Sequence, residues 1–363
     1  MALKVVDFFC GCGGTSAGLR KAGLEIILGL DFDPDAGKTY KANFKTAGFI
    51  DRDINQVTFA EISSHLKLSA DDSLVFCGCA PCQPFTKINT KKRRRDGRRS
   101  LLKRFGRFVK KFKPDYVIVE NVPGIQAVDT TSGPFKDFLD LLEAEGYGGE
   151  RCRFEVVGCQ FYGVPQCRRR LILIATRHGV KAPWPQKTHG PEGTRRKKLP
   201  TVWEKIKDLP PIAAGETHAS IPHHRTMNLS QKNLERIMAT PPEMGRESWP
   251  PELDLGLACH EGHEGHSDVY GRLKKHAPAA ALTTKCVSLS NGRFGHPEQD
   301  RAISLREAAL LQTFPKRFKF EGSMGSIARQ IGNAVPVSLA EQIGLAVAEH
   351  DRIRRLRAEV AEV

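Results

Sequence analysis

Two periodicities of hydrophobic residues alternate along the first half of the chain. Short apolar runs predict buried strands, and segments with apolar residues three and four positions apart predict the helices between them. The predicted strands are Leu3–Phe9, Leu24–Leu30, 73–78, 115–119, 153–157 and 170–176, and the predicted helices are one that ends near Lys21, Lys38–Phe44 and Phe135–Ala144. This alternation predicts the α/β class, with a doubly wound, mostly parallel sheet that carries helices on both faces.

A further helix is predicted between residues 101 and 112. Its apolar residues recur at helical spacing, and cations occupy the opposite face. The apolar positions are Leu101, Leu102, Phe105, Phe108, Val109 and Phe112. Such a helix can lie on a membrane surface, but we favour packing of the apolar stripe on the sheet.

The pattern changes from about Ala182, where prolines become frequent and the strand–helix alternation stops. Regular structure returns at Ser304 and Glu307, which fit a capping box that opens a helix through Gln312. A last helix is predicted from near Pro336. We therefore expect a first domain at 1–190, a second, smaller and irregular domain at 191–320, and a C-terminal segment at 321–363 that returns to the first.

The net charge of +15 is concentrated in one part of the sequence. Between Lys87 and Lys113, fourteen Lys and Arg residues stand against one acid, Asp96, so this stretch alone carries +13. Phosphate neutralisation with release of counterions drives binding to nucleic acids. The stretch therefore predicts a polyanionic partner.

Cysteine usage and the N-terminus indicate the compartment. Ten cysteines in 363 residues are too sparse for a secreted disulfide scaffold. The N-terminus lacks the pattern of a signal peptide, and no apolar run approaches membrane-spanning length. We expect a cytoplasmic protein with no membrane partner.

A glycine-rich turn at residues 9–14 follows the first predicted strand and precedes a helix, so its backbone can approach a ligand closely. Asp31 ends the second strand, where a carboxylate commonly accepts ribose hydroxyls. Phe32 could stack on a base, and Asp53 and Ile54 could frame an adenine edge. The turn reads Gly-x-Gly-Gly rather than Gly-x-Gly-x-x-Gly, which favours a smaller adenosine-bearing cofactor over a dinucleotide.

The chemistry is predicted at two neighbouring strand ends. Cys82 lies between two prolines after the strand at 73–78, and Glu120 ends the strand at 115–119. A cysteine beside a carboxyl group can act as a nucleophile with a proton donor. The alternatives are a buried structural thiol at Cys82 and a salt-bridged structural acid at Glu120.

Six ordered motifs resemble those of the DNA (cytosine-5) methyltransferases of bacterial type. They are Asp7–Gly14, Pro81–Phe85, Glu120–Val122, Gln166–Arg170, Arg301–Pro315 and Gln330–Pro336. Residues 185–290 fall where this family has its variable target-recognition region. The resemblance implies the fold of S-adenosylmethionine-dependent methyltransferases, with the irregular domain reading the DNA.

The resemblance also implies a mechanism. Cys82 would add to carbon 6 of cytosine, and Glu120 would protonate ring nitrogen 3. Arg168 and Arg170 would lie on one face of a strand and hold the cytosine carbonyl and the catalytic groups. Carbon 5 would then take the methyl group of S-adenosylmethionine. Because a paired cytosine cannot reach such a pocket, it must be flipped out of double-stranded DNA.

Binding residues are carried over from the same motifs. The cofactor would be bound by Phe9, Gly11, Gly13, Gly14, Asp31, Phe32, Asp53, Ile54, Pro81 and Asn333. DNA would be bound by Gln83, Lys91, Lys92, Arg93, Arg94, Arg95, Arg98 and Arg99. The resemblance is compatible with a monomer in the bacterial nucleoid and with a cognate restriction endonuclease that acts separately.

Other functions remain as alternatives. They are a transfer-RNA cytosine-5 methyltransferase, a catalytically silent DNA-binding relative and a dinucleotide oxidoreductase. Cys259, His260, His263 and His266 are candidate zinc ligands. Histidines spaced by three in a Gly-rich loop are more typical of surface residues, so we predict no metal.

Overall fold

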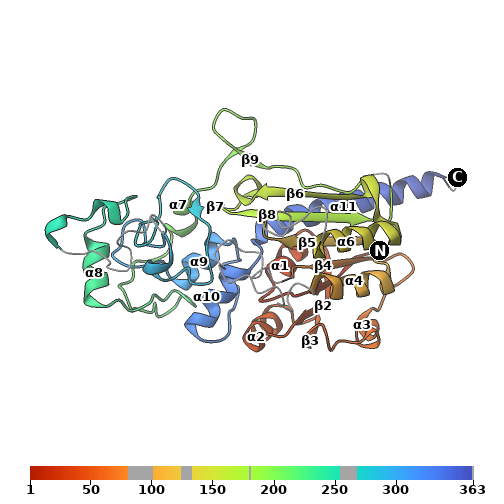
Figure 1. Cartoon of the computed structure of the whole chain (residues 1–363), viewed down its shortest axis with the longest axis horizontal. Coiled ribbons are helices and arrows are strands. Elements are labelled where there is room, and N and C mark those ends of the chain that lie inside the picture. The colour runs from red at the N-terminus through yellow and green to blue at the C-terminus, as the bar shows by residue number, and fades with distance from the viewer. Residues whose placement is uncertain (81–100, 124–132, 180, 254–267, 362–363) are drawn as a thin grey trace. The chain divides into compact units, whose positions relative to one another are not determined.

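The computed structural model describes residues 1–80, 101–123, 133–179, 181–253 and 268–361. These form two compact units (Figure 1). Unit 1 comprises Met1–Gly158, Arg169–Lys187 and Val335–Val363, and unit 2 comprises Cys159–Arg168 and Thr188–Ala334. This division differs from the expected boundaries in three places. Residues 159–168 and 188–190 belong to unit 2, and the return to unit 1 begins at residue 335 rather than 321.

Unit 1 is built on a seven-stranded sheet in the order β3-β2-β1-β4-β5-β8-β6. The strands are β1 (Leu3–Phe8), β2 (Glu25–Asp31), β3 (Gly48–Asp51), β4 (Ser73–Gly78), β5 (Tyr116–Asn121), β6 (Cys152–Gly158) and β8 (Arg169–Thr176). The first five strands in this order, β3, β2, β1, β4 and β5, are parallel to one another. Strand β8 runs antiparallel to both β5 and β6. The predicted doubly wound, mostly parallel sheet is confirmed.

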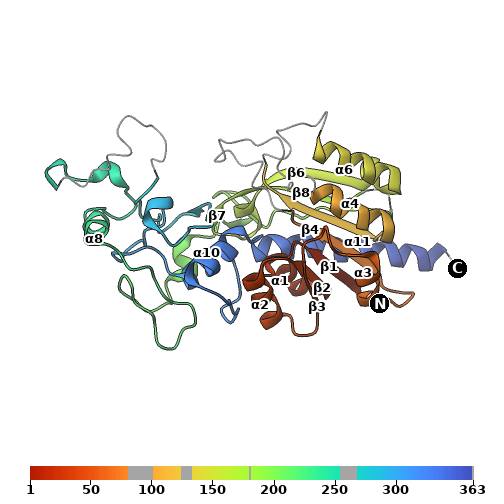
Figure 2. The ribbon, with the colours of Figure 1, turned by 60° about the horizontal axis from the view of Figure 1, so that its bottom comes forward.

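Helices cover both faces of this sheet (Figure 2). They are α1 (Gly14–Lys21), α2 (Pro34–Asn43), α3 (Phe59–His65), α4 (Leu101–Phe112), α6 (Pro134–Leu142) and α11 (Val337–Ala361). Val6 and Phe8 of β1 and Phe76 of β4 belong to one core cluster with buried residues of α3, α4 and α6. The predicted amphipathic helix is confirmed as α4, with Phe105 fully buried in this cluster.

Helices α1 and α11 pack against each other at two glycines. A Cβ atom added to Gly18 would lie 2.4 Å from the Val337 carbonyl oxygen, and one added to Gly344 would lie 2.7 Å from the Ala22 Cβ. Such distances require a hydrogen at both positions. The C-terminal helix thereby packs on the first helix of the same unit.

Unit 2 has short elements, as expected from its prolines. Its helices are α7 (Val202–Ile206), α8 (Gln231–Met238), α9 (Leu305–Leu311) and α10 (Met324–Asn333), and its strands β7 (Gln166–Cys167), β9 (His189–Gly190), β10 (Lys197–Lys198) and β11 (Ala279–Ala280). The predicted capping box is present, because the Ser304 hydroxyl accepts from Glu307 N and the Glu307 carboxylate accepts from Ser304 N.

The helical stretch Met324–Val360 is long and apolar enough to cross a membrane by length and composition, which the sequence analysis did not anticipate. Of its most apolar window, 61% is buried within the protein. Ala340, Ile343 and Val347 are each at most 2% exposed. Burial of this kind identifies a core helix.

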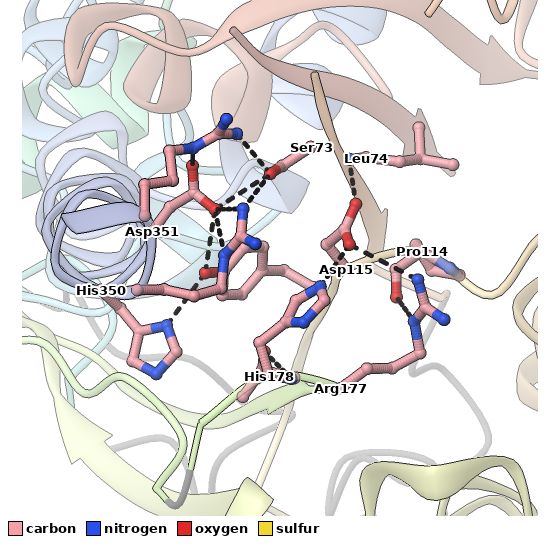
Figure 3. A network of polar contacts seen from close by, with 12 residues as sticks. Ser73, Leu74, Pro114, Asp115, Arg177, His178, His350 and Asp351 are labelled. Atoms are coloured by element: carbon pink, nitrogen blue, oxygen red, sulfur yellow. Dashed lines mark hydrogen bonds and ion pairs between the residues drawn. The ribbon is translucent and has the colours of Figure 1, made fainter. Parts of the chain in front are cut away.

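A polar network fixes α11 to the edge of the sheet where β4 and β5 begin (Figure 3). Asp351 is 4% exposed and accepts hydrogen bonds from Ser73, Tyr116, Arg354 and Arg355 at 2.6 to 3.3 Å. Burial raises the pKa of Asp351, but the hydrogen bonds from Arg355, Arg354 and Ser73 outweigh it and hold this pKa below the ordinary value.

We predict that Asp351→Asn destabilises unit 1 by about 2 kcal/mol at neutral pH, because two guanidinium groups lose their charged acceptor. The folded pKa lies below the ordinary value of 3.8, so this stabilisation is complete above that pH and is lost as pH falls through the folded pKa. Urea unfolding of both proteins between pH 7 and 3 should show the difference shrinking with acid. Glu349→Gln, which breaks an exposed ion pair with Arg352 on the same helix, should have little effect.

Candidate active site

Several of the described site residues predicted in unit 1 lie along one edge of the sheet. Parallel strands present their carboxyl ends at the same edge, so Asp53 after β3, Asp31 at the end of β2 and the turn 9–14 after β1 follow one another there. Cys79 and Ala80 after β4 and Glu120 in β5 continue the row. The strand order reverses between β1 and β4, and ligands of doubly wound sheets bind at such a switch point.

The turn 9–14 is held in an unusual backbone conformation. Phe9, Gly11 and Gly13 have φ angles of 59°, 51° and 92°. Gly14 is the first residue of α1. A Cβ added to Gly11 would meet no atom within 4 Å, whereas one added to Gly13 would lie 2.4 Å from the Phe44 ring. Gly11 therefore borders open space, and Gly13 is packed against the protein.

The ends of β2 and β3 carry polar and aromatic groups. The Asp31 carboxylate accepts hydrogen bonds from Gly11 N at 2.8 Å and from Asp33 N at 2.9 Å. Burial raises the pKa of Asp31 despite these backbone hydrogen bonds. Phe32 is 63% exposed, and the exposed Asp53 accepts from Asn55 N at 2.8 Å. Ile54, at 3% exposure, packs in the core.

This half of the edge fits an adenosine-bearing cofactor. The open space at Gly11 admits a ligand close to the backbone, and the exposed Phe32 ring can stack on a flat base. The Asp31 carboxylate accepts backbone hydrogen bonds from Gly11 and Asp33 and from Phe32, and its four lone-pair sites leave room for a hydroxyl group. Gly11 and Asp31 are in direct contact, and a cofactor contact of Phe9, Gly11, Asp31 and Phe32 stays a prediction.

The other half of the edge holds an ion pair. Arg170 Nε lies 2.7 Å from Glu120 Oε1, with side-chain exposures of 15% and 11%. Because β8 is antiparallel to β5, its first residues lie beside the carboxyl end of β5. The Asn121 side chain donates to the Ala80 carbonyl at 3.0 Å. Glu120 is therefore fixed beside the segment that leads into Pro81 and Cys82.

Burial raises the pKa values of the described cysteines near this edge. It raises the pKa of Cys12 to about 12 and those of Cys10, Cys77 and Cys79 well above the ordinary value. A raised pKa reduces the thiolate that a nucleophile requires. Cys79 also contacts the Thr15 hydroxyl at 3.4 Å.

Arg168 precedes the strand that carries Arg170, and their shared face stays a prediction. Strand β8 begins at Arg169, and Arg168 belongs to unit 2. Arg168 is 3% exposed, and its guanidinium donates to the carbonyls of Leu282 and Gly332 at 2.7 and 2.8 Å. The pairing of β8 with β6 begins at Arg169, one residue before the predicted strand 170–176. A contact of Arg168 with the cytosine stays a prediction.

Several predicted residues cannot be placed at the site. Asn333 is the exposed last residue of α10 in unit 2, and its cofactor contact stays a prediction. Outside the described residues lie Pro81, Cys82, Gln83, Lys91, Lys92, Arg93, Arg94, Arg95, Arg98 and Arg99, and also Cys259, His260, His263 and His266. In the described ranges, no group of three or more His, Cys, Asp or Glu side chains could hold a metal ion.

Sequence reasoning missed four residues near this edge. Asn121 and Thr15 contact the segment before Pro81, and Ser16 and Tyr40 form a buried hydrogen-bond chain with Asp7. Of the residues in this chain, Asp7 alone was recognisable in the sequence, because a carboxyl group in an apolar strand is rarely buried unless it is paired with other polar groups.

Comparison with known proteins bears on the whole chain. The family model described as C-5 cytosine-specific DNA methylase matches residues 3–349. The Type II methylase M.HgiDII of Herpetosiphon aurantiacus is 39% identical over 351 residues, which cover 96% of this chain and 95% of that protein. The Type II methyltransferase M1.HphI of Haemophilus parahaemolyticus is 29% identical over 349 residues, which cover 96% of this chain and 87% of that protein.

A solved structure shows the same fold. A putative DNA modification methyltransferase encoded within an E. coli prophage matches with a TM-score of 0.67 and 24% identity. The match covers 96% of this chain and 99% of the other.

We predict that alanine has different effects at the two glycines of the turn. Gly11→Ala should cost about 1 kcal/mol of unfolding free energy, the strain of a left-handed backbone. Gly13→Ala adds a clash with Phe44, which is 3% exposed and cannot move aside. Its cost should be at least twice as large. Chemical denaturation of both variants measures the difference, and equal costs would contradict the packing described for Gly13.

Proposed function

Because the chain belongs to the C-5 cytosine-specific DNA methylase family, it is a DNA (cytosine-5) methyltransferase, and we propose S-adenosylmethionine as its methyl donor and Cys82 as its nucleophile. The observation that carries the proposal is the Glu120–Arg170 ion pair beside Ala80. It fixes a carboxyl group next to the segment that bears Cys82, on the sheet edge that also carries the glycine turn.

The proposed reaction begins with the addition of the Cys82 thiolate to carbon 6 of the cytosine. Carbon 5 of cytosine is a poor nucleophile, and a bond at carbon 6 makes it electron-rich. The proton of Glu120 would pass to ring nitrogen 3 as the S–C6 bond forms. Arg170 would stabilise the carboxylate left on Glu120, since its guanidinium already lies 2.7 Å from that group.

S-adenosylmethionine would supply a methyl group activated by its sulfonium. The residues that would hold it are Phe9, Gly11, Asp31 and Phe32, with Gly13, Gly14, Asp53, Ile54, Pro81 and Asn333 as further proposed contacts. Once the methyl group is on carbon 5, removal of the carbon 5 proton would break the S–C6 bond and free Cys82 as its thiolate. The proton on ring nitrogen 3 would return to Glu120, which restores the neutral aromatic ring.

The substrate is proposed to be double-stranded DNA with its target cytosine flipped out. The cations from Lys91 to Arg99 and Gln83 would contact the DNA around the extruded nucleotide. We propose that unit 2 also binds the double-stranded DNA and recognises its base sequence. The Type II relatives support a separate cognate restriction endonuclease, and we propose a cytoplasmic monomer.

We predict that Cys82→Ala abolishes the transfer of tritiated methyl groups to duplex DNA. Cys152→Ala, which removes a thiol whose pKa burial raises to about 11, should retain activity. DNA that contains 5-fluorocytosine should form a covalent complex with the unmodified enzyme, because the fluorine atom cannot leave as a proton does. A complex that persists in Cys82→Ala would show that another residue is the nucleophile, and methyl transfer to RNA alone would favour the transfer-RNA alternative.

We predict that the basic segment controls the salt dependence of DNA binding. Arg93→Gln with Arg94→Gln should lower the slope of log K against log salt by up to about 1.8, if both residues neutralise phosphates. The matched control is Arg352→Gln with Arg357→Gln, which removes the same charge from exposed positions of α11. Fluorescence anisotropy at several salt concentrations measures both slopes, and equal changes in the two proteins would count against a local role of the segment.

A further inference from the structure

Two segments of unit 1 face the proposed cofactor, and they belong to different strands. The turn 9–14 follows β1, and Asp31 with Phe32 ends β2. The hydrogen bond from Gly11 N to Asp31 Oδ2, at 2.8 Å, joins them directly. A backbone hydrogen bond from Cys10 N to Leu30 O, at 3.0 Å, extends the β1–β2 pairing into the turn. A cofactor that binds both segments needs a fixed spacing between them, so contacts that fix this spacing affect its binding.

A further link is fully buried. The Ser16 hydroxyl donates to Asp7 Oδ2 at 2.6 Å and lies 3.0 Å from the Tyr40 hydroxyl. All three residues have no exposed surface. Asp7 belongs to β1, Ser16 to the first turns of α1 and Tyr40 to α2. The chain of hydroxyl and carboxyl groups thus joins the three elements from which the cofactor-facing segments emerge.

The Tyr40 ring packs against two glycines, one in β2 and one in the turn 9–14. A Cβ added to Gly29 of β2 would lie 2.4 Å from Tyr40 Cζ, and one added to Gly13 would lie 3.1 Å from Tyr40 Cδ2. Phe44 stacks on the other side, with ring centroids 4.4 Å apart. The ring therefore fills the space between the glycine turn and β2, and its hydroxyl reaches Ser16.

Asp7 is a costly residue at this position. Its Oδ1 atom is buried and has no hydrogen-bond partner among the described residues. Asp7 interacts electrostatically with the titratable groups of Asp31, Cys10, Cys77, Cys79 and Tyr40, none of which is a cation. Burial accordingly raises the pKa of Asp7 to about 7. A buried polar network of this cost is expected where geometry matters more than stability.

We propose that Asp7, Ser16 and Tyr40 act as a positioning network, which sets the spacing between the glycine turn and Asp31–Phe32 and thereby the affinity for S-adenosylmethionine. None of the three residues needs to touch the cofactor. The inference rests on the proposed function, since S-adenosylmethionine is its ligand.

The test uses Tyr40→Phe, which keeps the ring and removes only the hydroxyl. Titration calorimetry should show a dissociation constant for S-adenosylmethionine about fivefold higher than that of the unmodified enzyme. In the methylation assay, KM for S-adenosylmethionine should rise by a similar factor while kcat is unchanged, because the spacing affects binding and not the reacting groups.

The matched control is Tyr147→Phe. Tyr147 is also fully buried, and its hydroxyl donates to the Pro114 carbonyl at 2.6 Å, next to the start of β5 at the opposite edge of the sheet. Both variants lose one buried hydroxyl and should lose similar stability. Only Tyr40→Phe should change the dissociation constant. Equal constants in the two variants would overturn the inference.

A double-mutant cycle tests whether the residues act as one network. Ser16→Ala removes the middle link, so the double variant with Tyr40→Phe should bind S-adenosylmethionine no more weakly than Ser16→Ala alone. If the double variant instead raises the dissociation constant by the product of the two single factors, the residues contribute independently and the network is overturned. If the unmodified protein does not bind S-adenosylmethionine, the proposed cofactor fails and the inference with it. Binding by the unmodified protein and unchanged binding by Tyr40→Phe would overturn the inference alone.

Discussion

The antiparallel pairing of β8 with β5 is the constraint on which the catalytic half of the site depends. In a sheet whose first five strands are parallel, a sixth parallel strand would place Arg170 at the far edge, away from Glu120. The reversal pairs Asn121 with Leu171 and brings Arg170 to the carboxyl end of β5. The side chains of this charge pair are at most 15% exposed. Because desolvation offsets much of the attraction in such a pair, it contributes to the geometry of the site more than to stability.

The same edge of the sheet unites two tasks that the chain encodes far apart. Strands β1 to β3 carry the groups suited to an adenosine-bearing cofactor, and β4 and β5 lead to the proposed nucleophile Cys82 and the proposed acid Glu120. The halves meet between β1 and β4, where side chains connect them. Thr15 of α1 contacts Cys79 after β4, and Asn121 of β5 holds the Ala80 carbonyl. Neighbouring strand ends can therefore align a methyl donor and a base without any long loop to position them.

The edge at which β4 and β5 begin serves stability. There the final helix α11, more than 200 residues later in the chain than β5, is attached through Asp351, Ser73 and Tyr116 (Figure 3). Ionic contacts concentrated at this edge leave the carboxyl edge available for the reaction. The separation of the two roles is characteristic of doubly wound sheets, in which loops carry function and the strands fix their positions.

The sequence by itself determined the fold class, most strands of the sheet, the helix α4 and the capping box of α9, because apolar periodicity and local capping are properties of neighbouring residues. The sequence also indicated the family, through motifs in a fixed order. It did not predict β3, with four residues and one of them buried, or α10. The positions of Asp31 and Phe32 were predictable, since a strand end fixes where they lie. Strand direction was not, because an apolar run reads alike both ways. Only the tertiary structure therefore paired Arg170 with Glu120 and joined Asp7, Ser16 and Tyr40, whose contacts arise from the packing of β1, α1 and α2.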